Sequence, residues 1–114
     1  MFMARYMSSN HQIIFCTCPN KDTAEKLARL LVSGSSAACV NILPGIMSIY
    51  RWNEQIETDE ECLLLIKAHI DNYSAIETII HDHHPYELPE IIAVSITNGL
   101  PEYLQWITSC HSSK

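Results

Sequence analysis

Residues 37–70, AACVNILPGIMSIYRWNEQIETDEECLLLIKAHI, decide the fold because they predict two long strands joined by a tight turn. The first strand is Ala37–Tyr50, and Pro44-Gly45 interrupts it. Proline cannot donate a hydrogen bond within a sheet, so a bulge or a sheet edge is expected there. A turn is expected around Asn53-Glu54. The second strand is Glu57–Ile70, whose inner half is apolar on both faces, as in a buried strand.

The segments on either side of this hairpin alternate strand and helix. A short apolar run predicts a strand over Gln12–Cys18, and apolar residues at helical spacing predict helices over roughly Thr23–Ser33 and Tyr73–Asp82. A further strand is expected over Glu90–Ile96, and Pro101 opens a last helix. The order β-α-β-β-α-β with an extra C-terminal helix predicts an α+β fold. It is a ferredoxin-like sandwich, with two crossover helices on one face of a four-stranded antiparallel sheet.

Length and composition indicate one domain with a hydrophobic core. The chain has 114 residues, 47% hydrophobic and 18% charged, which suits a globular domain and not a disordered chain. We expect residues 12–111 to form this domain and residues 1–11 to be a disordered N-terminal leader. The formal charge of −6 argues against a nucleic acid partner, because acidic groups repel a phosphate backbone. Apolar runs such as Leu63–Ile66 are far shorter than the ~20 residues of a membrane span.

The cysteines indicate a reducing compartment. There are five, an odd number, and no two have CxxC spacing, so they do not form a disulfide framework. Reduced thiols are the rule in the cytoplasm, which is where we expect this protein to reside. Cys39 and Cys62 lie inside apolar strands, where a cysteine usually serves as a small buried group.

The predicted hairpin is too long for the helices that would cover it. A helix of ~11 residues extends about 16 Å, whereas a strand of ~13 residues extends about 43 Å. The far end should therefore project with an apolar surface made by Ile46, Met47, Ile49, Tyr50, Trp52 and Ile56. Such an arm is marginally stable and prone to aggregate, so we expect burial on another subunit. The alternative is that the break at Pro44 folds the arm back onto its own domain.

Histidines at the end of the second helix are the densest group of candidate metal ligands. His83 and His84 are neighbours, and Pro85 forces His84 out of the helix, so that the two rings can converge. Two imidazoles alone make a weak site, and the best third ligand is a thiol of the first strand, Cys16 or Cys18. One thiolate with two imidazoles favours copper or zinc. Alternatively, these histidines are surface groups that interact with the helix dipole.

The sequence contains no motif typical of an enzyme. A nucleophile elbow, a phosphate-binding glycine loop and an HExxH pair are all absent from the sequence, so we expect no catalytic activity. Lys67 stands inside an apolar strand, where it either neutralises a carboxylate or anionic ligand in a cleft or lies at a solvated edge. The acidic residues between Glu57 and Glu61 are expected to form a solvated hairpin surface.

Several segments closely resemble the CutA divalent-cation tolerance family. They are Ala37-Ala-Cys-Val-Asn-Ile42, Pro44-Gly45, Ser48, Tyr50, Trp52, Ile56, Leu65-Ile66-Lys67, His83-His84-Pro85-Tyr86, Pro89-Glu90, Gly99 and Tyr103-Leu104-x-Trp106. The resemblance runs from about Ile13 to Ile107. It implies a ferredoxin-like fold, a cytoplasmic homotrimer related in architecture to the PII signal-transduction proteins, and a role in tolerance to copper and other divalent metals. It also implies copper ligands at Cys16, His83 and His84.

The leading hypothesis is therefore a non-enzymatic cytoplasmic homotrimer that binds copper, or another divalent cation, through those three residues. The alternative is a PII-like regulatory trimer that binds a small anionic ligand between subunits. Its candidate cleft residues are Lys67, Tyr50, Trp52 and Glu61. A third hypothesis is a structural adaptor whose trimer presents a surface to a protein partner.

Overall fold

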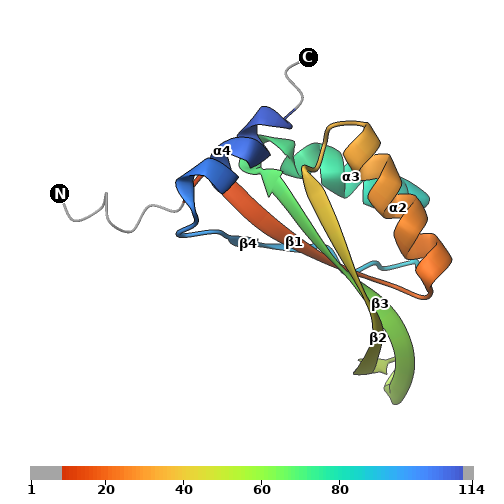
Figure 1. The fold of residues 1–114 in the computed structure, drawn as a ribbon. Coiled ribbons are helices and arrows are strands. Elements are labelled where there is room, and N and C mark those ends of the chain that lie inside the picture. The colour runs from red at the N-terminus through yellow and green to blue at the C-terminus, as the bar shows by residue number, and fades with distance from the viewer. Residues whose placement is uncertain (1–8, 112–114) are drawn as a thin grey trace.

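The computed structural model describes residues 9–111, and its elements follow the order expected from the sequence (Figure 1). These elements are β1 (His11–Cys18), α2 (Lys21–Ser33), β2 (Cys39–Trp52), β3 (Gln55–His69), the short 3₁₀ helix η1 (Ile70–Asn72), α3 (Tyr73–His83), β4 (Ile92–Ser95) and α4 (Pro101–Ser109). None of these helices combines the length and the apolar character that crossing a membrane requires.

Two residues of the predicted leader, Ser9 and His11, take part in the sheet. His11 is the first residue of β1, and the backbone N–H of Ser9 donates to the carbonyl of Ile96 at 3.1 Å. Ser9 and His11 are therefore part of the fold. The rest of the predicted leader, residues 1–8, lies outside the described residues.

The four strands form one antiparallel sheet in the order β2-β3-β1-β4. Helices α2 and α3 lie on the same face of this sheet (Figure 1), and the hydrophobic core fills the space between the helices and the strands. Its largest fully buried side chains are Ile14, Leu27, Leu31, Leu64, Ile66, Ile76 and Ile80. This arrangement confirms the ferredoxin-like α+β fold.

The β2–β3 hairpin extends past the helices as a projecting arm (Figure 1). Its register shifts between Leu43 and Ile46, which confirms the irregularity expected at Pro44-Gly45, and Gly45 has a φ of 74°. At the tip, Asn53 and Glu54 have φ values of 50° and 65°. Two consecutive positive values are what a type I′ turn requires, so the turn also lies where it was predicted.

The irregularity exchanges the two faces of β2 relative to β3. Leu43 pairs with Leu63 before it, and Ile46 pairs with Glu61 after it. On the helix-covered face, odd-numbered residues of β2 therefore replace even-numbered ones beyond this point. One face of the arm therefore continues the helix-covered face of the sheet beyond the ends of the helices. Three apolar side chains on that face are 67–70% exposed: Met47, Ile49 and Ile56.

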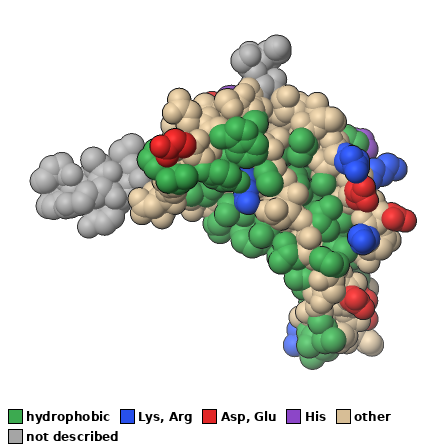
Figure 2. All heavy atoms as spheres, in the orientation of Figure 1, with side chains coloured by type: hydrophobic (Ala, Val, Ile, Leu, Met, Phe, Trp, Pro, Cys, Tyr) green, Lys and Arg blue, Asp and Glu red, His purple; other side chains and the backbone are tan. Residues whose placement is uncertain are grey.

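The opposite face of the sheet carries α4 at one end. His11 Nε2 lies 2.8 Å from Thr108 Oγ1, and Lys67 Nζ lies 5.9 Å from the centre of the Tyr103 ring, so α4 packs over the ends of β1 and β3. Figure 2 shows apolar side chains gathered across the middle of the molecule and at the end of the arm. Large apolar residues that remain exposed on β4 and around α4 are Ile92, Val94, Leu100, Tyr103 and Trp106. Surfaces of this kind are typical of protein–protein interfaces.

Candidate functional site

Two thiols and one imidazole converge beside the core, where β1 passes the end of α3. Cys16 and Cys18 are two residues apart on a strand, so both side chains point to the helix-covered face. His84 follows α3 directly, and its ψ of 139° is the extended backbone that a residue before proline adopts. One donor atom from each of these three buried residues lies within 4.8 Å of the other two. The structure thus brings together Cys16 and His84, two of the predicted ligands, and adds Cys18.

Both ring nitrogens of His84 have partners in the protein. Nε2 lies 2.8 Å from the carbonyl oxygen of Thr17, to which only a protonated nitrogen can donate. Nδ1 accepts a hydrogen bond from the backbone N–H of Tyr86 at 3.1 Å. These two contacts select the neutral tautomer with its proton on Nε2, which is a form that can bind a metal through Nδ1. Such binding would replace the hydrogen bond from Tyr86.

The two thiols of the cluster affect each other's ionisation. A hydrogen bond with Cys18, reinforced by burial, raises the pKa of Cys16. The same hydrogen bond lowers the pKa of Cys18, although burial opposes this effect. Cys18 is therefore the thiol that loses its proton first. The Cys16 thiol donates to the carbonyl oxygen of Thr17 at 3.7 Å. Because the thiolate is the metal-binding form, a set of two sulfurs and one imidazole suits copper or zinc.

His83 does not join this cluster. It is the last residue of α3, its side chain is exposed, and its Nδ1 lies 2.8 Å from the carbonyl oxygen of Ile79 one turn earlier. Among the described residues, the donor group at this place contains Cys18 and not His83. The ligand set Cys16, His83 and His84 stays a prediction. The two-residue period of a strand is the sequence signal that puts Cys16 and Cys18 on one face.

A pocket of about 760 Å³ lies between the arm and the segment that follows α3. Tyr50, Trp52 and Glu61, three of the four candidate cleft residues, line it. Lys67 does not line the pocket. It is six residues farther along β3 than Glu61, which is a separation of about 20 Å in a strand. Its side chain lies near the ring of Tyr103 instead. The other lining residues are Thr17, Ser48, Ile49, Pro85, Tyr86, Glu87, Leu88 and Glu90.

The polar lining of this pocket is acidic. Tyr86 Oη donates to a carboxylate oxygen of Glu61 at 2.6 Å, and the hydroxyl of Tyr50 donates to Asp59 on the arm. Three glutamates and no lysine or arginine are found among the described residues that line the pocket. The charge therefore favours a neutral or cationic ligand over the anionic ligand of the alternative hypothesis. Tyr86, which donates a hydrogen bond to Glu61, is one of the pocket residues that the predicted cleft omitted.

Tyr50→Phe is expected to make the protein less sensitive to alkaline pH. The hydrogen bond to Asp59 raises the pKa of Tyr50 to about 12, whereas tyrosine in an unfolded chain has a pKa of about 10. Since the folded state holds this proton more tightly, the bond stabilises the fold below pH ~10, and its contribution is lost as the pH rises from ~10 to ~12. Thermal melts over this range should show a steeper fall in Tm for the parent. Parallel curves would contradict the expectation.

The sequence and the fold both match one family of known proteins. A family model described as CutA1 divalent ion tolerance protein matches residues 12–110. The Protein CutA homolog of Xenopus laevis is 42% identical over 102 residues, which are 90% of this chain and 68% of that protein. The chain spans 57–68% of the length of the vertebrate relatives that head its matches.

Solved structures agree with this match. CutA from Xylella fastidiosa has a TM-score of 0.89 and 47% sequence identity, and the alignment covers 91% of this chain and 100% of that one. A protein described as the periplasmic divalent cation tolerance protein CutA of Archaeoglobus fulgidus has a TM-score of 0.86 and 34% identity, over 88% of this chain and 97% of that one. The chain therefore belongs to the CutA1 divalent ion tolerance protein family.

Proposed function

We propose that this protein is a non-enzymatic metal-binding protein that takes up copper, or another divalent cation, and so contributes to metal tolerance. The observation that supports the proposal is the convergence of Cys16, Cys18 and His84, whose donor atoms lie within 4.8 Å of one another. Thiolate and imidazole are ligands for copper and zinc, whereas magnesium and calcium prefer oxygen. Family membership supports a role in tolerance to divalent cations in general.

These three residues fit a metal in their chemistry. A metal that binds both sulfurs would replace the proton of each thiol, and these protons would pass to solvent. The neighbouring pocket is lined by Thr17 and Pro85 but by none of the three donor residues, which are all buried. A metal would therefore have to reach the donors through a local opening of the structure. A metal held there would be enclosed by protein, as sequestration requires.

We further infer a homotrimer in a reducing compartment, the cytoplasm. The exposed apolar residues of the arm and of β4 support assembly, because a surface of this kind is normally covered. All five cysteines are free, which suits a compartment that keeps thiols reduced. The Archaeoglobus relative carries a periplasmic name, so fractionation of the native cells is the direct test of location.

Cys16→Ser and His84→Ala are each expected to weaken copper binding by more than about 100-fold, since loss of an outer-shell partner alone typically costs 10- to 100-fold. The measurement is a titration of the reduced protein with copper under oxygen-free conditions, against a competing chelator. His83→Ala distinguishes the two ligand sets. The geometry predicts near-parental affinity for it, whereas the set Cys16, His83 and His84 predicts a loss.

His81→Ala is the matched control, because His81 is an exposed histidine of the same helix that lies outside the cluster. Circular dichroism should show that each variant keeps the parental fold. Copper binding that persists unchanged in both Cys16→Ser and His84→Ala would contradict the proposal. The acidic pocket would then become the leading candidate for a ligand site, with a neutral or cationic ligand.

A further inference from the structure

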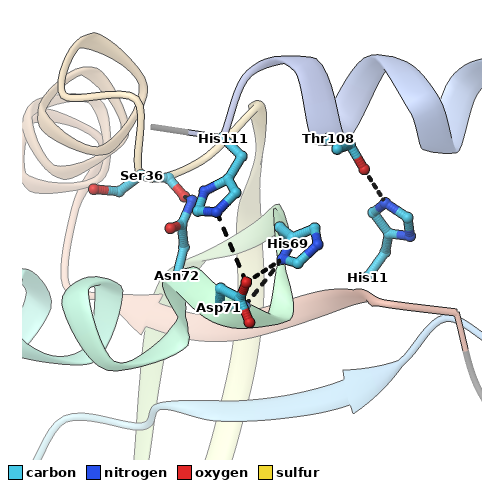
Figure 3. Close-up of polar contacts among 7 residues, drawn as sticks. All are labelled: His11, Ser36, His69, Asp71, Asn72, Thr108 and His111. Atoms are coloured by element: carbon cyan, nitrogen blue, oxygen red, sulfur yellow. Dashed lines mark hydrogen bonds and ion pairs between the residues drawn. The ribbon is translucent and has the colours of Figure 1, made fainter. Parts of the chain in front are cut away.

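A second group of metal-binding side chains lies at the other end of the sheet. His69 ends β3, Asp71 lies in η1, and His111 follows the last turn of α4 (Figure 3). One donor atom from each lies within 4.8 Å of the other two. His69 pairs with His11 across β1 and β3, whereas Cys18 is at the opposite end of β1, about 23 Å away along a strand. This group is therefore distinct from the cluster of thiols and His84.

Local structure fixes all three side chains in place. The backbone N–H of Asp71 donates to Nδ1 of His69 at 3.1 Å, which closes the turn that carries the Asp71 carboxylate back toward the ring. The N–H of His111 donates to the carbonyl of Thr108 at 2.9 Å and folds the chain back after α4. The His111 ring then stacks on His69, with centroids 4.8 Å apart and planes within 5° of parallel. Figure 3 shows both rings beside one carboxylate.

The distances in this group are close to those of a metal site. Oδ2 of Asp71 lies 3.6 Å from Nδ1 of His69 and 3.9 Å from Nε2 of His111. Ligand bonds of 2.0–2.1 Å in tetrahedral geometry put two donor atoms about 3.3 Å apart. Rotation of the exposed Asp71 side chain would bring its carboxylate closer. The two rings would also have to turn out of their parallel stack, because the lone pair that binds a metal lies in the plane of each ring.

A cation accounts for this arrangement better than an ion pair between protein groups. Nδ1 of His69 accepts a hydrogen bond, so it carries no proton and faces the carboxylate oxygen with a lone pair. Two stacked imidazoles beside one carboxylate cannot both become cationic without repelling each other. A metal ion would convert these opposed lone pairs into bonds, since it binds neutral imidazole and ionised carboxylate.

The surroundings of the group are short of hydrogen-bond partners. Nδ1 of His111 and Nδ1 of His11 are buried, and neither has a partner among the described residues. His11 is only 8% exposed, and its ring packs edge-on against His69 at 5.6 Å. The ring of His69 therefore contacts two other imidazoles, those of His11 and His111.

We propose that His69, Asp71 and His111 form a second metal site, for a divalent transition metal of the zinc, nickel and copper(II) class. Two imidazoles and a carboxylate are ligands that this class prefers. Asp71 is the most exposed of the three, at 66% of its side chain, so water can complete the coordination sphere. Access is direct from solvent, unlike access to the buried thiols.

The test is a calorimetric titration of the reduced parent and two variants with Zn²⁺. His111→Ala and Asp71→Asn change residues at the surface of the group, and both should keep the parental fold by circular dichroism. We expect the parent to bind one more Zn²⁺ per chain than either variant. His81→Ala is the matched control and should bind as many Zn²⁺ as the parent.

Equal stoichiometry and affinity in the parent, His111→Ala and Asp71→Asn would overturn the proposal. A failure of this proposal can be told apart from a failure of the site formed by Cys16, Cys18 and His84, because the two sites share no residue. Cys16→Ser should lose the zinc bound at the thiols and keep the zinc bound at His69 and His111. Loss of this second zinc in Cys16→Ser would also overturn the assignment, since it would mean that one site had been counted twice.

Discussion

Ile66→Ala is expected to lower the free energy of unfolding by about 2–5 kcal/mol, the range for removing a large aliphatic side chain from a packed core. Ile66 lies on β3, and its side chain points into the core between the sheet and the two helices. None of its surface is exposed. Its cross-strand neighbours are Ile14 on β1 and Val40 on β2. A cavity at this point would border the two strands that join the arm to the rest of the sheet, so little of it can be filled by a local shift.

Urea denaturation at one fixed protein concentration measures this loss, because the stability of an oligomer depends on concentration. Val32→Ala on α2 is the control. Val32 is 43% exposed, so its truncation should cost no more than about 0.5 kcal/mol, as surface changes usually do. A loss for Ile66→Ala no larger than that for Val32→Ala would mean that Ile66 is not part of a tightly packed core.

The order of the elements could be predicted because each is specified by local signals. The missing N–H of Pro44 predicted an irregular point in β2, and the register shifts there. Its consequence could not be predicted. Whether the strand resumes with Ile46 opposite Glu61 depends on pairing with β3, not on the local sequence. That register decides that Met47 lies on the helix-covered side, whereas Tyr50 lies on the opposite side and lines the pocket.

The candidate metal centre could be predicted only in part. Residue spacing pointed to one thiol of the first strand, Cys16 or Cys18, and the family resemblance selected Cys16 with His83 and His84. The packing of α3 against β1 instead places His84 beside both thiols. Successive residues of a helix point about 100° apart, and only His84, which leaves the helix, reaches the strand. His83 remains helical and bonds back to its own helix.

The second histidine group could not be predicted at all, because its members are far apart in the sequence. Some 40 residues separate Asp71 from His111, and they meet only because α4 packs across the ends of β1 and β3. Lys67 is the opposite case, a residue that the sequence placed in a site and the structure does not. Its place in an apolar strand suggested a cleft residue, yet the packing of α4 puts it beside Tyr103, away from the pocket.

A double variant, Ile49→Glu with Ile56→Glu, is expected to be monomeric under conditions in which the parent is a trimer. Both isoleucines lie on one face of the arm and are 67% and 68% exposed in the single chain. Burial of an isoleucine in an interface contributes roughly 1.5–3 kcal/mol, so the pair contributes about 3–6 kcal/mol per subunit. Two unpaired carboxylates in an apolar contact add a desolvation cost in the same direction.

Sedimentation velocity over a dilution series measures the effect directly as a change in mass. Val32→Glu is the control, because it puts the same charge on an exposed apolar position of α2, away from the arm. This variant should keep the parental mass. A parent that sediments as a monomer at every concentration would contradict the trimer, and a double variant with the parental mass would show that the subunits do not associate through the arm. The arm carries three apolar side chains that are 67–70% exposed within one subunit, those of Met47, Ile49 and Ile56, so its burial should contribute strongly to assembly.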